Sequence, residues 1–462
     1  MIPFGLLSGF MDSKEIRITE LGEDGFRFRL TEECPEPEQF RICFYDMKKA
    51  GYRKVEIRKF EMNAVAGTLE AEERCVQEND GSFFREYSVR VEQKDYVQEV
   101  QRLAGEYSRY IRLKLDGDDG ELAKTLTGYP AELDEVHCES LEEQKKLWFG
   151  GNSSSVRRNP DADQSVEESF LDKGTELALE LNGPFLYEEY LCQPLQDFLA
   201  SYWQKNYLTH SYFAGRIPDR FYIGNQFCHL LFPERKLLFE IIEKAAAEQV
   251  EITLVFSYIR EYMLDYITEL LDEINRWCEE KRQSVEIVVN DWGTAHLAAH
   301  FPVFSICLGI LLNKRKKDPR MAYKLGDRTL FEKNSVHAAF YRKYLKAEFQ
   351  IERYEWESCG NTGTGKFPEG KNSMHLPFYQ TNTSQYCPLY AACTKGSRGA
   401  QTPVRKCHRF CEEQAFLYPE HLRMMGRYNS LFGIDLSILQ EPEAMGKMYG
   451  LRGIDRIVVN LL

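Results

Sequence analysis

Segments with the pattern of buried strands alternate with amphipathic helical segments from about residue 217 onward. The order is RFYIGNQF, ERKLLFEIIEKAAAEQ, VEITLVFSYI, REYMLDYITELLDEINRWCEEKRQ and VEIVVN, followed by a short helical stretch through AHLAAH. This alternation predicts a parallel sheet with helices outside it. With IDRIVVNLL as the last strand, residues 215–462 have the usual length of a (β/α) TIM-like barrel. An open doubly wound sheet is the alternative.

The first part of the chain has a different pattern. Residues 1 to about 115 alternate polar and apolar side chains in short runs such as FRFRL, FRICFY and EYSVRV. This pattern predicts a small antiparallel β domain, to which DYVQEVQRLAGEYSRYIRLKL adds a helix and one more strand. We therefore expect a β-rich domain at 1–148, a linker and helical connection at 149–214, and the barrel at 215–462.

Length and charge limit the class of protein. A chain of 462 residues with 43% hydrophobic residues predicts two or three domains that fold without help from a metal. The net charge of -13 argues against non-specific coating of nucleic acid, although a local basic groove is compatible with it. MIPFGLLSGFMDSKE lacks signal-peptide features, and PVFSICLGILL is too short to span a bilayer. We expect a cytoplasmic protein that does not bind membranes.

Polar residues that directly follow the expected strands are candidates for an active site, because the C-terminal ends of barrel strands form the catalytic face. They are Asn225, Gln226 and Cys228 after the first strand, Ser257 and Arg260 after the second, and Asn290, Asp291 and Trp292 after the third. Asp291 is compatible with two roles. It orients substrate or accepts a proton, or its side chain caps the helix that follows.

Four cysteines lie within 25 residues near the C-terminal end, with the spacing C-x5-C-x13-C-x3-C. They are Cys387, Cys393, Cys407 and Cys411, and the basic residues around them are Lys395, Arg398, Arg405, Lys406, His408 and Arg409. Thiolates select zinc or iron-sulfur clusters, and nearby positive charge stabilises thiolates. The short C-x2-C pairs of structural zinc sites are absent. A disulfide or redox pair and a solvated basic loop are the other readings.

The segment GNTGTGK at 360–366 has the spacing of a phosphate-binding P-loop. Phe367 follows it at the position where a Ser or Thr binds magnesium, and Pro368 opposes the helix whose N-terminus should hold the phosphate. The segment is therefore expected to be an ordinary Gly-rich loop.

Three segments resemble peptidase family U thirty-two, the collagenase-like family: FYIGNQFCHLLFPER, VEIVVNDWGTAHL and HLPFYQTNTSQYCPLYAACTKGSRGAQTPVRKCHRFC. The resemblance covers about residues 215–462 and does not reach the first 200. It is to the members that act in oxygen-independent hydroxylation, among them an anaerobic ubiquinone-biosynthesis pair and RNA-hydroxylating enzymes. Those members carry a [4Fe-4S] cluster.

The resemblance implies a [4Fe-4S] cluster held by four cysteines, with zinc as the alternative. The implied ligands are Cys228, Cys393, Cys407 and Cys411, with Cys387 as a fifth candidate. It further implies hydroxylation of a small aromatic molecule or an RNA base, with Asp291 and Asn290 on the same face of the barrel. The alternatives are a non-catalytic cluster- or zinc-bearing protein that binds an enzymatic homologue or RNA, and a peptidase.

Overall fold

The computed structural model describes residues 6–30, 36–46, 51–65, 85–115, 137–146, 149, 174–315, 317, 334–358, 366–396, 403–417 and 424–461. The chain divides into two compact units, Met1–Asp134 with Arg320–Lys343 and Glu135–Pro319 with Tyr344–Leu462. Apart from Lys366, the segment GNTGTGK lies outside the described residues. In the described ranges, no helix combines the length and the apolar character needed to cross a membrane.

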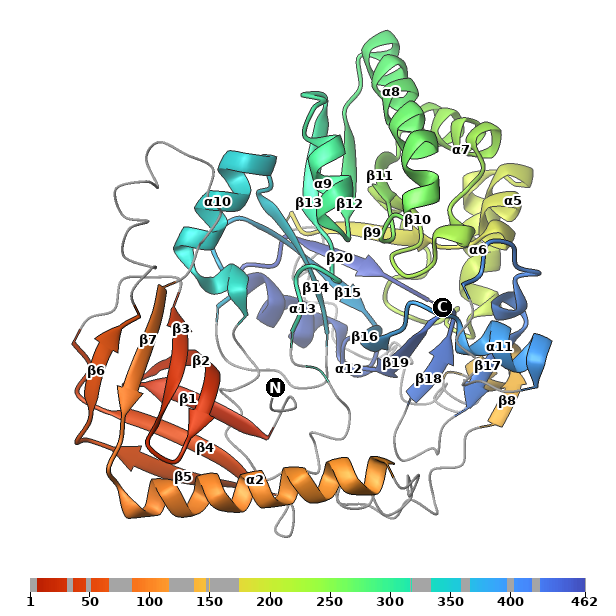
Figure 1. Ribbon diagram of the computed structural model, residues 1–462. Coiled ribbons are helices and arrows are strands. Elements are labelled where there is room, and N and C mark those ends of the chain that lie inside the picture. Colours follow the sequence, from red (N-terminus) through yellow and green to blue (C-terminus); the bar gives the residue numbers. More distant parts are fainter. Residues whose placement is uncertain are drawn as a thin grey trace. The chain divides into compact units, whose positions relative to one another are not determined.

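The first unit contains an antiparallel sheet of seven strands in the order β5-β4-β1-β2-β3-β7-β6 (Figure 1). The strands are β1 (Leu7–Met11), β2 (Lys14–Gly22), β3 (Gly25–Leu30), β4 (Phe40–Asp46), β5 (Gly51–Ile57), β6 (Glu61–Ala64) and β7 (Arg85–Arg90). This sheet confirms the predicted antiparallel β domain.

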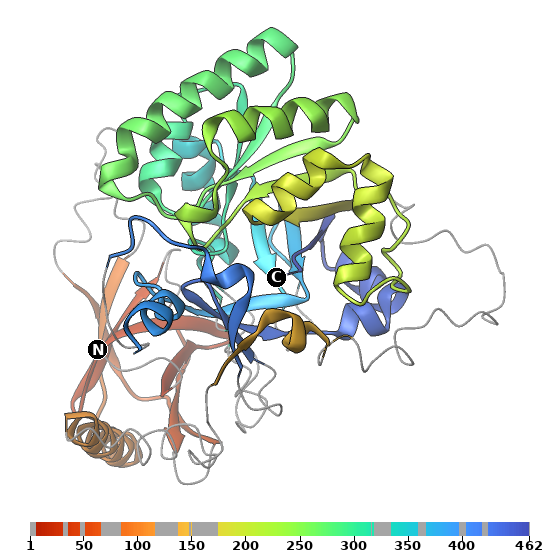
Figure 2. The ribbon, with the colours of Figure 1, turned by 90° about the vertical axis from the view of Figure 1, so that its right-hand side faces the viewer.

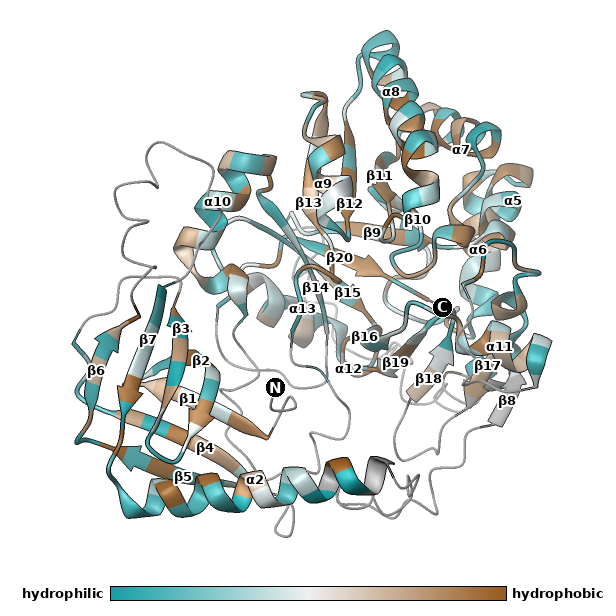
Figure 3. Ribbon diagram, in the orientation of Figure 1, coloured by the Kyte–Doolittle hydropathy of each residue, from teal (hydrophilic) through white to brown (hydrophobic). Residues whose placement is uncertain are grey.

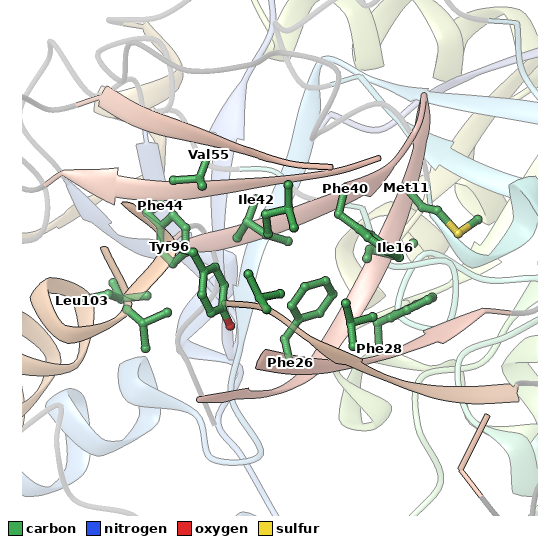
Figure 4. Packing of buried hydrophobic residues seen from close by; sticks show 14 of the residues in the cluster. Met11, Ile16, Phe26, Phe28, Phe40, Ile42, Phe44, Val55, Tyr96 and Leu103 are labelled. Atoms are coloured by element: carbon green, nitrogen blue, oxygen red, sulfur yellow. The ribbon is translucent and has the colours of Figure 1, made fainter. Parts of the chain in front are cut away.

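Helix α2 (Lys94–Leu115) covers the apolar face of this sheet. Tyr96, Val100 and Leu103 recur at helical spacing and are all buried in the same cluster as the rings of Phe26 and Phe40 (Figure 4). The Tyr96 hydroxyl donates to the carbonyl of Gly25 at 2.7 Å, which satisfies its buried polar group. The helix continues to Leu115, through the segment that the sequence predicted to be a further strand, and the side chains described after Leu103 are half-buried or exposed. An ion pair between Arg102 and Glu106, one helical turn apart, supports the helix there.

The second unit is built on a closed barrel of eight parallel strands in the order β10-β11-β12-β13-β14-β15-β20-β9 (Figures 1 and 2). The strands are β9 (Glu176–Leu181), β10 (Arg220–Gly224), β11 (Glu251–Val255), β12 (Val285–Val289), β13 (Phe304–Leu308), β14 (Arg353–Glu357), β15 (Lys371–Leu376) and β20 (Arg456–Val459). This closed barrel confirms the predicted fold class. Its first strand, β9, lies before the expected boundary at residue 215.

Helices surround the barrel, as the alternation of strand and helix predicted. They are α5 (Pro184–Cys192), α6 (Leu195–Lys205), α7 (Arg235–Ala247), α8 (Leu264–Lys281), α9 (Trp292–Ala298) and, across the boundary between the two units, α10 (Ala339–Phe349). Helix α8 buries Ile267, Leu270 and Ile274, which share one face. Figure 3 shows hydrophobic barrel strands such as β9 and β20, more hydrophilic strands β14 and β15, and outer helices of mixed hydropathy.

Between β15 and β20 the chain leaves the barrel in an excursion that forms four strands of a second, five-stranded antiparallel sheet in the order β16-β19-β18-β17-β8, and β8, which precedes the barrel in the chain, adds the fifth. Its strands are β8 (His137–Ser140), β16 (Phe378–Thr383), β17 (Gln414–Leu417), β18 (Met424–Arg427) and β19 (Ser430–Ile434). The associated helices are α4 (Leu141–Lys145), α11 (Pro388–Lys395), the 3-10 turn η8 (Phe410–Glu412), α12 (Ser437–Gln440) and α13 (Pro442–Leu451). This excursion contains the whole cysteine-rich segment.

The excursion is joined to the loops that follow β10 and β11. The Asn429 side-chain amide donates to the carbonyl of Phe227 at 3.0 Å and to the hydroxyl of Tyr258 at 2.8 Å. It also donates to the carbonyl of Ser384 at 2.8 Å. Since Asn429 is buried, these bonds fix the cysteine-rich segment over the C-terminal ends of two barrel strands.

Charged side chains occupy the N-terminal end of the barrel interior. Glu286 on β12 accepts from Arg456 at 2.6 Å and lies 3.5 Å from Arg220 and 3.6 Å from Arg353. Burial by itself raises the pKa of Glu286, but the hydrogen bond and the charges of the three arginines outweigh burial and lower this pKa to about 2. Glu176 accepts from Arg220 and from Arg456, each at 2.6 Å. These paired charges fill the N-terminal end of the barrel interior. The C-terminal end of the interior, called the upper barrel below, holds other side chains.

Candidate functional site

Four cysteines from three segments of the chain line one pocket in the second unit. They are Cys228, Cys387, Cys407 and Cys411. The pocket holds about 530 Å³ of empty space, part of it open to solvent, and it is walled by residues that follow β10 and β11 and by the excursion. It therefore lies at the C-terminal ends of barrel strands, where the catalytic groups of such barrels are found.

Cys228 reaches the pocket through a tight turn after β10. The Asn225 side-chain oxygen accepts from the backbone amides of Phe227 and Cys228, both at 2.9 Å. The turn begins at Gly224, whose φ of +123° is unfavourable for other residues and whose added Cβ would lie 2.3 Å from the carbonyl of Val255. These local features direct the chain from the strand into the thiol pocket.

Cys387 enters the pocket because it caps helix α11. Pro388 occupies the first turn of that helix, and the Cys387 sulfur accepts from the amide of Tyr390 at 3.4 Å. The Cys387 thiol donates to the carbonyl of Tyr428 at 3.0 Å. Cys393 lies six residues further along, is exposed, and is not among the residues that line the pocket. Of the five cysteines expected near a cofactor, four line this pocket, and they include Cys387, the fifth candidate, but not Cys393, which the resemblance implied.

Cys407 and Cys411 flank a short irregular turn. Arg409 adopts a left-handed conformation with φ of +59°, and its amide donates to the sulfur of Cys407 at 3.3 Å. Cys411 lies in η8, and Arg427 donates to its carbonyl at 2.8 Å. Backbone amides that donate to sulfur stabilise a thiolate and tune any cluster bound to it. The structure supplies such donors to Cys407 and Cys387.

The four thiols lie close enough to affect one another's ionisation. Burial raises the pKa of Cys411 to about 12, with contributions from Cys387 and Cys407, and burial raises that of Cys387 to about 11, with contributions from Cys407 and Cys393. Burial also raises the pKa of Cys228, with contributions from Cys411, Cys387 and Cys407. Cys228, Cys387 and Cys411 are therefore protonated near neutral pH unless a cationic group binds them, because a bound metal favours the thiolate.

Cys228 and His229 are neighbours in the sequence but do not form an activated nucleophile pair. Burial, together with the charge of Arg260, lowers the pKa of His229 to about 4, so the imidazole is neutral at neutral pH. A cysteine nucleophile needs a thiolate stabilised by a nearby cation, and the raised pKa of Cys228 is the opposite condition. The pocket is therefore suited to bind a group through sulfur rather than to attack a peptide bond.

The charge of the pocket wall is positive. Arg260 and Arg409 line it, and no Asp or Glu is found among its described lining residues. This is notable in a chain with a net charge of -13. A cluster held by four thiolates is an anion, so a wall with arginines and without carboxylates matches it electrostatically.

A single metal ion fits the pocket less well than a cluster does. In the described part of the chain, no group of three or more His, Cys, Asp or Glu side chains is close enough to hold one ion. Zinc with sulfur ligands requires every sulfur about 2.3 Å from one point. A [4Fe-4S] cluster instead takes one thiolate on each iron, and so needs thiols distributed around a pocket. The all-sulfur donor set around a single pocket fits the second requirement.

Asp291 and Asn290, the expected catalytic residues, are held by backbone and side-chain partners away from the thiols. Asp291 caps α9, accepting from the amide of Thr294 at 2.9 Å and from its hydroxyl at 2.6 Å, and it also accepts from the amide of Ile259 at 3.0 Å. Asn290 donates to the carbonyl of Phe256 at 2.8 Å. Neither residue lines the pocket. The geometry of Asp291 corresponds to its helix-capping alternative.

A second group of polar side chains lies inside the upper barrel, and sequence reasoning did not identify it. Glu180 on β9, Glu355 on β14 and His375 on β15 meet there, and all three are buried. The available signal was the presence of ionisable residues in short strand segments, among apolar residues in ELALEL and among other polar residues in RYEWE and KNSMHL. Such residues are almost never fully buried unless they are paired.

Comparisons with known proteins add little to this geometry. No protein-family model matches the chain, and no curated protein matches it. Among solved structures, an uncharacterised Legionella protein, Lpg0364, matches at 11% identity over 23% of this chain and 96% of that one, with a TM-score of 0.15. A similarity of that extent carries no argument about fold or function.

Proposed function

We propose that this protein is a cytoplasmic iron-sulfur enzyme that hydroxylates an aromatic or nucleobase substrate without molecular oxygen. The observation that carries the proposal is the convergence of Cys228, Cys387, Cys407 and Cys411 on one arginine-lined pocket at the C-terminal end of a barrel. The resemblance of residues 215–462 to the collagenase-like family points to the same chemistry. When bound, a [4Fe-4S] cluster would supply one-electron transfer at this place.

The aromatic and basic side chains at the rim of the pocket suit a flat, negatively charged substrate. Tyr262 is 51% exposed, and its hydroxyl lies 2.7 Å from the ring nitrogen Nε2 of His229, which lines the pocket. The guanidinium of Arg405 lies over the Tyr262 ring at 5.3 Å, and that of Arg260 lies over Tyr258 at 4.9 Å. Aromatic rings interleaved with arginines bind unstacked bases and their phosphates. These groups favour an RNA base over a small neutral aromatic molecule.

A mass-spectrometric comparison tests the proposed reaction. Cells with and without the gene are grown without oxygen, and both nucleosides from digested total RNA and extracted small aromatic molecules are measured. We expect one nucleoside or aromatic compound that is heavier by one oxygen atom only when the protein is present. Cys407→Ser should abolish this product, whereas Cys192→Ser, which changes an exposed thiol outside the pocket, should retain it. Absence of any such compound from both fractions would refute the proposed reaction.

A further inference from the structure

Arg427, the last residue of β18, lies behind one of the four thiols of the pocket. Its Nε donates to the carbonyl of Cys411 at 2.8 Å, and its guanidinium lies over the ring of Tyr428 at 4.7 Å. Cys411 and Tyr428 both line the pocket, whereas Arg427 does not. Arg427 is only 8% exposed. These contacts hold a buried positive charge in the wall behind Cys411.

The charge of Arg427 is not neutralised within the described part of the chain. Its Nη1 is buried and has no hydrogen-bond partner there, and none of the described Asp and Glu residues forms an ion pair with it. Arg456, the buried arginine at the N-terminal end of the barrel interior, instead donates to Glu176 and to Glu286, each at 2.6 Å. A buried charge is costly unless it is paired. We therefore expect a bound anion to pair with Arg427.

The ionisable side chains nearest to Arg427 in the fold do not supply this negative charge. Glu412 lies in η8, but its Oε1 is itself buried without a hydrogen-bond partner in the described ranges. Helix α4 lies against the same turn, since the amide of Leu141 donates to the carbonyl of Glu413 at 2.8 Å. This helix carries a second cation, Lys145, whose pKa is lowered to about 7 by burial and then by the charge of Arg427. The positive charges on this side of the turn thus repel each other until an anion binds.

We propose that Arg427 is the buried counter-charge of an iron-sulfur cluster held by Cys228, Cys387, Cys407 and Cys411, and that it raises the reduction potential of that cluster. This inference rests on the proposed function. A [4Fe-4S] cluster on four thiolates is an anion, and one-electron reduction by an external low-potential donor adds one more negative charge at the same place. A fixed positive charge attracts the reduced form more strongly than the oxidised form, and burial keeps water from screening this attraction.

Arg235 on α7 offers a matched control outside the pocket. Its guanidinium lies over the ring of Tyr266 at 5.4 Å, and it forms ion pairs with Glu269 at 3.2 Å and Glu273 at 3.1 Å. Its side chain is 38% exposed. Both arginines thus stack on a tyrosine, and glutamine at either position removes one positive charge from the protein. Only Arg427 is buried beside a thiol of the pocket.

A potentiometric titration followed by electron paramagnetic resonance tests the proposal. Wild type, Arg427→Gln, Arg427→Lys and Arg235→Gln are prepared anaerobically as full-length proteins and reduced stepwise with dithionite. At the wild-type midpoint potential, Arg427→Gln should have a ratio of reduced to oxidised cluster about tenfold lower, which is a shift of about 59 mV to more negative potential. Arg427→Lys, which keeps the charge, and Arg235→Gln should stay within about threefold of the wild-type ratio.

The glutamine and lysine variants separate the charge of Arg427 from its packing. Glutamine can still donate to the carbonyl of Cys411, so loss of that hydrogen bond does not explain a shift that lysine reverses. A midpoint potential of Arg427→Gln equal to that of Arg235→Gln would overturn the proposal. Equal shifts in Arg427→Gln and Arg427→Lys would assign the effect to packing and overturn it as well, as would failure of both variants to take up a cluster.

The measured quantity is a potential and not a rate, so failure of the proposed function can be recognised separately. A wild-type protein with a cluster but without hydroxylated product would refute the proposed reaction and leave the role of Arg427 standing. A wild-type protein that takes up no cluster would refute both.

Arg427→Met decides the case in which Arg427→Gln does not fold. Since replacing an unpaired buried charge by apolar atoms removes its desolvation cost, metal-free Arg427→Met should melt at no lower temperature than metal-free wild type. It should also lose its cluster to a chelator about tenfold more readily, as expected when a group that supports a metal site is removed. An unfolded Arg427→Met protein, or one that retains its cluster as well as wild type does, would overturn the proposal.

Discussion

Cys387→Ala is expected to abolish the visible iron-sulfur absorption of anaerobically prepared protein, whereas Cys393→Ala should leave it unchanged. Cys387 caps α11 and lines the thiol pocket, while Cys393 is exposed on the same helix and does not line it. Loss of a residue that merely supports a metal ligand costs 10–100-fold in metal affinity, so loss of a ligand itself should cost about tenfold or more. Iron analysis and absorption spectra measure the difference.

The pair is informative because the two substitutions are chemically identical and only six residues apart. Both variants should keep the circular dichroism of the wild type, which shows that an effect on colour is not an effect on folding. Retained iron in Cys387→Ala together with lost iron in Cys393→Ala would contradict the pocket described by the structure. That result would return the assignment to the one that the sequence resemblance implied.

His375 should make the barrel lose stability as the pH rises. The pKa of a histidine in the unfolded chain is about 6.5. In the folded protein burial lowers the pKa of His375, but the hydrogen bonds and charges of Glu180 and Glu355 outweigh burial and raise it to about 9. The stabilisation is therefore fully present below pH 6.5 and is lost as the pH rises through about 9. Such a difference corresponds to on the order of 3 kcal/mol of unfolding free energy.

Urea unfolding followed by tryptophan fluorescence measures this effect in the right unit, because all five tryptophans lie between residues 148 and 356 and none in Met1–Asp134 or Arg320–Lys343. His375→Asn should be much less stable than wild type at about pH 6 and similar to it at about pH 10. His296→Asn, at an exposed helix position, should track the wild type at both. An equal deficit of His375→Asn at both pH values would show that the imidazolium is not the source.

The barrel could be predicted because its strands and helices obey local rules. Segments such as VEITLV and RFYIG are apolar and short, and the helices between them repeat apolar residues at 3.6-residue spacing. Strand β9 was not predicted, because Glu176 and Glu180 place charged residues at inward positions of the segment ELALEL. Only closure of the barrel shows that arginines on β10 and β20 and the histidine on β15 neutralise them.

The thiol set was harder to predict, because it depends on how a helix begins. Cys387 is the N-cap of α11, with an extended backbone and its sulfur against the amide of Tyr390, whereas Cys393 lies within the helix and is exposed. Pro388 is the local signal, since proline at the first helical position places the preceding residue at the cap. Membership of Cys228 requires the tertiary contact between Asn429 and Phe227, which no local pattern contains.

Iron and acid-labile sulfide analysis of anaerobically purified protein, combined with electron paramagnetic resonance, tests the central claim most directly. The pocket formed by Cys228, Cys387, Cys407 and Cys411 predicts a brown protein with about four iron and four sulfide ions per chain and a reducible cluster signal. A colourless protein that contains neither iron nor sulfide after anaerobic purification and reconstitution would contradict it.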